Sequence, residues 1–396
     1  MGAHVPILHS ITEQSRLLGY IAIDSTVAGR SRGGLRLVPD LSPEEISAAA
    51  TSMTLKYGLL GLPQGGAKAG LFGDPDASPV ERRLKLSAFA AAAATLLRAH
   101  QYVPDADLGT TAAEVREMML AVGARVGPRE WRANHSGEHT ARSCLATARA
   151  LLERGGTGLN GCRVAVEGFG KVGAPLARLL AARGATVVAI STSRGAIYRP
   201  DGLDVPRLVD RAATVGSRVV DQEPGRMDRE GLLELPVDLL CPCARYHSVH
   251  AGNVERIAAS TIAAGANDPV SPDAERRLEE RGVRYVPAFV SNCGGVLGGT
   301  LEFAGVALPR IATLIEEAVR RLVPGLLERA ERAGVSPGQL ATSEALARHA
   351  AVRARAEHPG LTGRLAAAGL AAYHRGWIPA SLVAPVATRH LLRGLL

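Results

Sequence analysis

The first 125 residues combine short apolar stretches with stretches of helical period. GYIAIDSTVAG and GGLRLVP have the apolar and β-branched character of strands. SPEEISAAATSMTLKYGLL predicts a helix capped by Ser42, with Glu45 at the capping-box position. The glycine-rich stretch LPQGGAKAG predicts a turn, and further helices are expected over residues 79–99 and about 111–122. This part of the chain is therefore predicted to be mixed α/β.

A different succession of elements follows an irregular stretch near residues 124–138. A helix over 139–154 precedes a strand, a turn, a helix and a second strand, in the order CRVAVEGFG, APLARLLAARG and ATVVAIST. Further strands are predicted at VDLLCPC, STIAAGAN and VRYVPAFV, and the chain beyond residue 300 is predicted to be helical. Strands that alternate with helices in this way are typical of a Rossmann-like, doubly wound parallel sheet.

Composition limits the class of protein and the cellular location that this fold can have. The chain has 396 residues, of which 46% are hydrophobic, so it can bury large cores. Its longest apolar run, LSAFAAAAATLL, is shorter than the roughly 20 residues of a membrane helix, so no membrane partner is expected. The N-terminus lacks the features of a secretory signal, and the five cysteines are odd in number and irregularly spaced. We therefore expect a cytoplasmic protein with reduced thiols.

A formal net charge of +8 raises the possibility of a nucleic-acid partner. The arginines are scattered among glutamates in helical stretches, and aromatic residues make up only 4% of the chain. We expect no nucleic-acid partner. His135 with His139, and His247 with His250, have spacings that could present two nitrogens, but no third ligand is evident, so no metal site is predicted.

GFGKVG supplies three glycines in the spacing G-x-G-x-x-G. It directly follows a predicted strand and opens a predicted helix, so the backbone there can approach a pyrophosphate at the start of the helix. We predict a dinucleotide-binding turn. Its predicted cofactor-binding residues are Gly168, Phe169, Gly170, Lys171, Val172 and Gly173.

The end of the second strand bears on the choice of dinucleotide. NAD-binding sheets usually place an acidic residue there, about 20 positions after the turn, to hold the ribose 2′-hydroxyl. Here the strand ends in ISTSRG, where Thr192 is neutral and Arg194 follows. These residues could hold a 2′-phosphate, which favours NADP or the use of both NAD and NADP. Alternatively, Arg194 is a solvated turn residue.

Lysine is rare in this sequence. Only four of the 46 basic residues are lysines, at positions 56, 68, 85 and 171. Arginine keeps its proton in proteins, so a lysine at position 68 is consistent with a site that needs a removable proton. Glycines around Lys68 leave room for a small substrate, and a neighbouring cation such as Lys56 would lower the pKa of Lys68.

Seven blocks in a fixed order resemble the glutamate/leucine/phenylalanine/valine dehydrogenases over roughly residues 20–305. They are GGLR, SMTLKYGLLGLPQGGAKAGLFGDP, VPDADLGT, GFGKVG, SRGAIYRPDGLD, GANDP and VSNCGGV. The resemblance implies reversible NAD(P)-dependent oxidative deamination of an L-amino acid to a 2-oxo acid and ammonium, by a homo-oligomer. From the succession of elements along the chain we expect three parts: a substrate-binding and oligomerisation domain over 1–135, an NAD(P)-binding Rossmann domain over 136–330 and a C-terminal helical segment over 331–396.

The resemblance also assigns roles to individual residues. It implies that Lys68 is the catalytic amine, that Asp107 handles protons and that Lys56 binds the substrate α-carboxylate. Asp105 is the competing carboxylate, although the DLGT match favours Asp107. The other implied substrate-binding residues are Arg32, Gly65, Gly66 and Asn292, and Asn292 and Thr140 are also expected near the nicotinamide.

Several positions depart from the family pattern and leave the substrate open. Arg32 stands where glutamate-specific relatives place a lysine for the side-chain carboxylate, but Gly299 stands where they usually offer a serine. Ala264 and Ala288 occupy positions that resemble acidic ones in relatives, and the WRANHSGE loop is expected to be shorter than usual. A glutamate-like substrate is favoured. The alternatives are a dehydrogenase for branched-chain, aromatic or specialised biosynthetic amino acids, and a catalytically silent homologue with a binding or assembly role.

Overall fold

The computed structural model describes residues 5–125, 127 and 135–395. The chain divides into two compact units by its internal contacts. Unit 1 contains residues 1–134, 303–306 and 342–395, and unit 2 contains residues 135–302 and 307–341. Residues 337–341 at the start of one C-terminal helix therefore belong to unit 2, and the described chain after them belongs to unit 1. Each unit is described here by itself.

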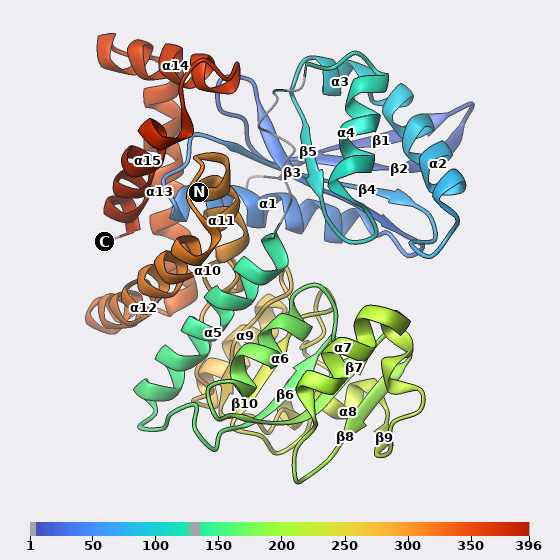
Figure 1. The fold of residues 1–396 in the computed structure, drawn as a ribbon. Helices are drawn as coiled ribbons and strands as arrows, with labels where there is room; N and C mark the ends of the chain where they lie inside the picture. Colours follow the sequence, from blue (N-terminus) through green and yellow to red (C-terminus); the bar gives the residue numbers. More distant parts are fainter. Residues whose placement is uncertain (1–4, 126, 128–134, 396) are drawn as a thin grey trace. The chain divides into compact units, whose positions relative to one another are not determined.

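Unit 1 is built on a five-stranded sheet with the order β1-β2-β4-β3-β5 (Figure 1). Its strands are β1 (Ile7–Glu13), β2 (Arg16–Ile23), β3 (Ser31–Val38), β4 (Gly65–Phe72) and β5 (Val103–Ala106). Its helices are α1 (Pro43–Leu59), α2 (Pro79–Ala92), α3 (Ala94–Arg98), α4 (Ala112–Ala121), most of α13 (Pro337–Glu357), α14 (Leu361–His374) and α15 (Ala380–Leu395). Ser42 caps α1 and accepts a hydrogen bond from the Glu45 amide at 3.3 Å, which confirms the predicted start of this helix.

The stretch LPQGGAKAG does not form the predicted turn, because Gly65–Phe72 is strand β4, between β2 and β3. Side chains alternate along a strand, so Ala67, Ala69 and Leu71 enter the apolar core on one face of the sheet. Lys68 lies on the other face with Gly66. A Cβ at Gly66 would lie 2.3 Å from the Thr54 amide nitrogen, so this glycine allows α1 to pack closely against the sheet.

Unit 2 has a six-stranded sheet with the order β11-β10-β6-β7-β8-β9. The pairs among β11, β10, β6 and β7 are parallel, and β8 and β9 add antiparallel edge strands. The strands are β6 (Arg163–Glu167), β7 (Thr186–Thr192), β8 (Gly195–Tyr198), β9 (Arg226–Met227), β10 (Leu239–Pro242) and β11 (Thr261–Ile262). This arrangement confirms the predicted α/β fold with a Rossmann-like sheet.

Helices cover both faces of the unit 2 sheet. Val164 and Val166 of β6 belong to an apolar cluster with α5, α6 and α7, whereas Ala165 belongs to a cluster with α8 and α9. The helices of this unit are α5 (Ser136–Arg154), α6 (Gly173–Ala181), α7 (Val205–Val215), η1 (Gly216–Val220), α8 (Arg229–Leu233), η2 (Val254–Arg256), α9 (Pro272–Glu280), α10 (Ala288–Ser291), α11 (Gly294–Phe303) and α12 (Leu308–Ala333).

The strand predicted at VRYVPAFV is wrong. Arg284 makes only an isolated bridge to Thr261, and Pro287 begins the short helix α10. Proline has no amide hydrogen to donate to a sheet, so it favours the start of a helix over a central strand.

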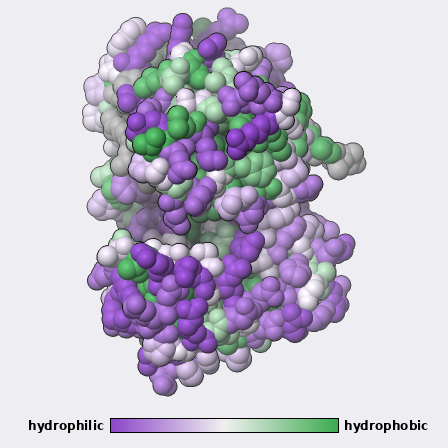
Figure 2. Space-filling view, turned by 90° about the vertical axis from the view of Figure 1, so that its right-hand side faces the viewer, coloured by the Kyte–Doolittle hydropathy of each residue, from purple (hydrophilic) through white to green (hydrophobic). Residues whose placement is uncertain are grey.

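None of the helices in the described part of the chain is both long and apolar enough to cross a membrane. The face drawn in Figure 2 carries mostly hydrophilic residues, with apolar residues in smaller patches.

Candidate active site

Strands β3, β4 and β5 present ionisable side chains beside Lys68. The side chain of Lys68 is 4% exposed, and its ammonium forms an ion pair with Asp107 Oδ2. Arg36 Nε donates to the same Oδ2 atom at 3.0 Å, and the Arg36 guanidinium also pairs with Glu45. The predicted catalytic pair is therefore in direct contact, within a buried network of two cations and two carboxylates.

The network lowers the pKa of Lys68. Burial lowers this pKa, Asp107 raises it and the Arg36 charge lowers it, and the net value lies below that of an ordinary lysine. The sequence pointed to Lys56 as the cation responsible, whereas burial and Arg36 are the causes in the structure. Burial raises the pKa of Asp107, but the charges of Lys68 and Arg36 lower it by more, so it lies well below its usual range.

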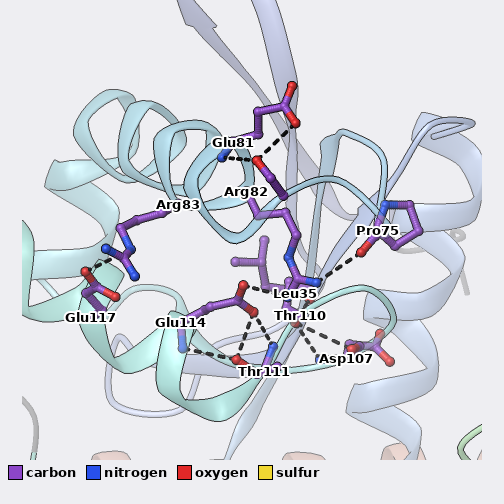
Figure 3. A network of polar contacts seen from close by, with 11 residues as sticks. Leu35, Pro75, Glu81, Arg82, Arg83, Asp107, Thr110, Thr111, Glu114 and Glu117 are labelled. Atoms are coloured by element: carbon purple, nitrogen blue, oxygen red, sulfur yellow. Dashed lines mark hydrogen bonds and ion pairs between the residues drawn. The ribbon is translucent and has the colours of Figure 1, made fainter. Parts of the chain in front are cut away.

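Hydrogen bonds within the loop that follows β5 hold the backbone at Asp107 in place (Figure 3). The Asp107 amide donates to Thr110 Oγ1 at 3.0 Å, and that hydroxyl donates to the Leu35 carbonyl of β3 at 2.8 Å. Thr111 then caps α4 through a reciprocal capping box with Glu114. These bonds fix Asp107 at the end of β5, which explains the local role of the DLGT sequence.

Replacing Arg36 with Gln tests whether the charge of Arg36 lowers the pKa of Lys68. Arg36 lowers the pKa of Lys68, so its removal raises that pKa and moves the rise of kcat/KM with pH to higher pH. The direction follows because a lysine base acts when deprotonated. The measurement is the pH profile of kcat/KM. Arg83→Gln, which removes a mostly exposed arginine of α2, should leave the profile unchanged. An unchanged profile for Arg36→Gln would exclude this electrostatic role.

Arg32 and Asp105 form a second ion pair in unit 1. Arg32 Nε and Nη2 donate to the two Asp105 carboxylate oxygens at 2.7 and 2.6 Å. The structure thus separates the two candidate carboxylates, because Asp107 contacts Lys68 and Asp105 contacts Arg32. An arginine expected to meet a substrate side chain already has a carboxylate partner within its own unit.

The remaining predicted residues of unit 1 are buried. Lys56 lies near the end of α1 and is 5% exposed. Gly65 and Gly66 have structural reasons to be glycine, since a Cβ at Gly65 would lie 2.3 Å from the Ser25 carbonyl oxygen. The Gly66 amide donates to Ser25 Oγ at 2.9 Å, so packing and hydrogen bonding within the unit account for both glycines.

The glycine turn of unit 2 connects β6 to α6 as predicted. Gly168 has φ of +90°, and a Cβ at Gly173 would lie 1.8 Å from the Gly168 carbonyl oxygen, so both glycines are required by the fold. Gly170 is different, because a Cβ there would meet no atom within 4 Å. Open space at the middle glycine fits a turn that a pyrophosphate approaches closely. Of the other turn residues, Phe169 is buried, Lys171 is exposed and Val172 precedes α6.

Side chains at and just after the end of β7 interact with other residues of unit 2. Thr192 Oγ1 donates to the Ser217 carbonyl at 2.8 Å, and Arg194 Nε donates to Asp221 Oδ2 at 2.8 Å. Arg194 is thus a turn residue with a side chain that is 54% exposed, as the alternative interpretation held, and its charge is paired with Asp221.

Asn292 follows helix α10 rather than a strand, which corrects the sequence prediction for its position. Its Nδ2 donates to the Ala266 carbonyl at 2.8 Å, while Oδ1 is buried with no hydrogen-bond partner in the described part of the chain. Such an unsatisfied amide oxygen is suited to a ligand donor. Thr140 lies in α5, where its hydroxyl donates to the Ser136 carbonyl at 2.7 Å.

The departures from the family pattern lie in different environments. Ala264 and Ala288 are buried, so carboxylates there would need partners, whereas Gly299 is exposed on α11 with open space around it. Residues 131–134 of the WRANHSGE loop lie outside the described residues. Within the described ranges, no group of three His, Cys, Asp or Glu side chains is placed to hold a metal ion.

Sequence reasoning missed three ionisable residues at these sites. Arg36 and Glu45 complete the Lys68 network, and strand alternation could have found Arg36, because a charged residue lay inside the predicted GGLRLVP strand. Glu167 ends β6 just before the glycine turn. Burial raises its pKa to about 7, although Ser248 Oγ donates to it at 3.1 Å.

The two units define a class of protein, an oxidoreductase with a dinucleotide-binding sheet and a lysine-centred site. The model of the Glutamate/Leucine/Phenylalanine/Valine dehydrogenase family matches residues 133–354, and the model of the Glu/Leu/Phe/Val dehydrogenase dimerisation domain matches residues 2–123. The chain belongs to the Glu/Leu/Phe/Val dehydrogenase family. It is an NAD(P)-dependent amino-acid dehydrogenase that acts on CH–NH2 donors, as the sequence predicted.

Individual relatives are similar over most of their length. The glutamate dehydrogenase of Thermotoga maritima is 34% identical over 298 residues, which cover 72% of each chain. The NAD-specific glutamate dehydrogenase of Staphylococcus aureus is 31% identical over 297 residues, again 72% of each chain. The crystal structure of hetero-hexameric glutamate dehydrogenase from Thermus thermophilus in its Leu-bound form has a TM-score of 0.74 and 27% identity, and the match covers 88% of each chain.

Proposed function

We propose that this dehydrogenase oxidatively deaminates a glutamate-like amino acid, with Lys68 as the general base. The buried contact between Lys68 and Asp107, beside Arg36, is the observation that carries the proposal. It places an amine of lowered pKa next to a carboxylate that is ionised in the resting pair. The relatives named as glutamate dehydrogenases support the substrate class. The relatives named as NAD-specific support NAD as a cofactor, and the hexameric relative supports an oligomer. A homo-oligomer in the cytoplasm remains part of the proposal.

Each group in the proposed reaction has a separate role. Lys56 pairs with the substrate α-carboxylate. The turn at Gly170 would hold the dinucleotide, which when bound would supply the hydride acceptor for oxidation at Cα. Neutral Lys68 removes a proton from the water that attacks the resulting iminium carbon. Once Lys68 is neutral, Asp107 loses the charge that lowers its pKa most, so it accepts and returns the proton on the substrate nitrogen as ammonia leaves. In reverse, the same groups support reductive amination of a 2-oxo acid.

The substrate class is tested by reductive amination with ammonium, NADH or NADPH and a panel of 2-oxo acids. We expect the highest kcat/KM with 2-oxoglutarate. A higher value with a branched-chain or aromatic 2-oxo acid would favour the alternative substrate class. No turnover with any member, from protein that binds the dinucleotide, would favour a catalytically silent homologue.

Asp105→Ala tests whether Arg32 faces the substrate side chain. The variant removes the carboxylate that pairs with Arg32, so it should raise kcat/KM for 2-oxoglutarate relative to 4-methyl-2-oxopentanoate by about tenfold. Asp40→Ala, which removes an aspartate before α1, serves as the matched control and should leave the ratio unchanged. An unchanged ratio in Asp105→Ala would place Arg32 away from the substrate side chain.

A further inference from the structure

The carboxyl end of β7 has no acidic side chain of its own. It ends in Ser191 and Thr192, and Arg194 follows. The Gly168 amide donates to Ser191 Oγ at 2.9 Å, so this end of β7 borders the glycine turn. In dinucleotide-binding sheets, the adenosine ribose lies here and an acidic residue binds its 2′-hydroxyl when the dinucleotide is NAD.

A carboxylate from a later segment of the chain, that of Asp221, lies beside the carboxyl end of β7. The bond from Thr192 to Ser217 places η1 against the end of β7, and Asp221 directly follows η1. Arg194 Nε donates to both Asp221 carboxylate oxygens, at 3.1 and 2.8 Å. Arg226 of β9 donates to Asp221 Oδ1 at 3.4 Å and to the Arg194 carbonyl at 3.1 Å. Two guanidinium groups therefore share one carboxylate at the edge of the proposed ribose site.

We propose that Asp221 takes the place of the missing β7 carboxylate and makes the site selective for NAD over NADP. The inference rests on the proposed role of the glycine turn in binding the dinucleotide. Asp221 accepts the ribose 2′-hydroxyl of NAD. It also occupies Arg194 and Arg226, which would otherwise bind a 2′-phosphate. This assignment reverses the preference for NADP or dual use that Arg194 indicates when the sequence is considered alone.

The charges of Asp221, Arg194 and Arg226 explain why the site would select NAD over NADP. The hydrogen bond from Arg194 holds the pKa of Asp221 below its usual range, so the carboxylate is ionised at neutral pH. A 2′-phosphate is repelled by that charge and reaches the arginines only by displacing Asp221. A 2′-hydroxyl needs only an acceptor. The Asp221 side chain is 24% exposed, so it can accept a bond from a ligand while it remains paired.

Calorimetric titration with adenosine 5′-monophosphate and adenosine 2′,5′-bisphosphate tests the inference without turnover. We expect the parent to bind the monophosphate more tightly. Asp221→Asn should tighten bisphosphate binding about tenfold relative to the monophosphate, because the repulsion is lost and both arginines are released. In the Asp221→Asn background, Arg194→Gln should weaken bisphosphate binding relative to the monophosphate, because Arg194 is then released to bind the 2′-phosphate. Asp210→Asn, at an exposed position of α7, is the matched control and should behave as the parent.

The outcomes separate this inference from the function on which it rests. If neither nucleotide binds the parent, although the protein is folded by circular dichroism, the proposed dinucleotide site is wrong. If the parent binds the monophosphate, and Asp221→Asn has the same ratio of bisphosphate to monophosphate affinity as the parent, Asp221 does not select the cofactor. A parent that prefers the bisphosphate would also overturn the inference. If Asp221→Asn does not fold, Asp221→Ser takes its place in the same titrations, and an unchanged ratio of bisphosphate to monophosphate affinity in that variant would overturn the inference.

Discussion

Lys68→Arg is expected to lower kcat by about 10³-fold, while the protein folds and binds its dinucleotide with unchanged affinity. The substitution keeps a positive charge beside Asp107, so the ion pair of the buried network can persist. Arginine cannot release its proton in a protein, so the base is lost although the charge remains. Steady-state kinetics with ammonium and a 2-oxo acid measure the effect, and nucleotide titration measures binding.

Lys85→Arg is the matched control for this prediction. Lys85 lies on α2 and donates to the Phe72 carbonyl at 3.4 Å, so arginine should be tolerated there with full activity. If Lys68→Arg were as active as Lys85→Arg, the role of Lys68 would be electrostatic, and the base would have to be another group.

Two substitutions in the glycine turn are expected to separate stability from dinucleotide binding. Gly170→Ala adds a methyl group into open space and outside the left-handed region, so the free energy of unfolding should change by less than about 1 kcal/mol. Dinucleotide affinity should nevertheless fall at least about tenfold, because the methyl group occupies the approach of the pyrophosphate. Gly173→Ala places a Cβ 1.8 Å from a backbone oxygen and should cost about 2–3 kcal/mol of stability.

Denaturant unfolding and calorimetric titration of NAD separate the two effects. We expect Gly173→Ala to be less stable than the parent. We expect Gly170→Ala to be as stable as the parent but to bind NAD more weakly. Parental NAD affinity in Gly170→Ala would mean that the ligand does not approach this turn.

The sequence predicted the parts of the site that depend on local spacing. The G-x-G-x-x-G turn required only a strand before it and a helix after it, and both are present as β6 and α6. The sequence also placed Lys68 and Asp107 in one site through the family resemblance, and the structure brings them into contact.

The parts that depend on tertiary pairing could not be predicted. Glycine is depleted in strands, so the stretch around Lys68 indicated a turn, whereas the close packing of α1 against β4 is what requires glycine there. The contact of Arg36 with Asp107 joins residues 71 positions apart, and that of Arg194 with Asp221 joins residues 27 positions apart. Neither spacing forms a local motif, so only the fold identifies these partners.

The most direct test of Lys68 as the base measures ammonium release and cofactor reduction together, with L-glutamate and NAD as reactants. We expect equal amounts of ammonium and NADH from the parent, and neither from Lys68→Arg, although that variant binds NAD as the parent does. Equal turnover by the variant, or a parent that binds NAD and oxidises no amino acid, would contradict the assignment.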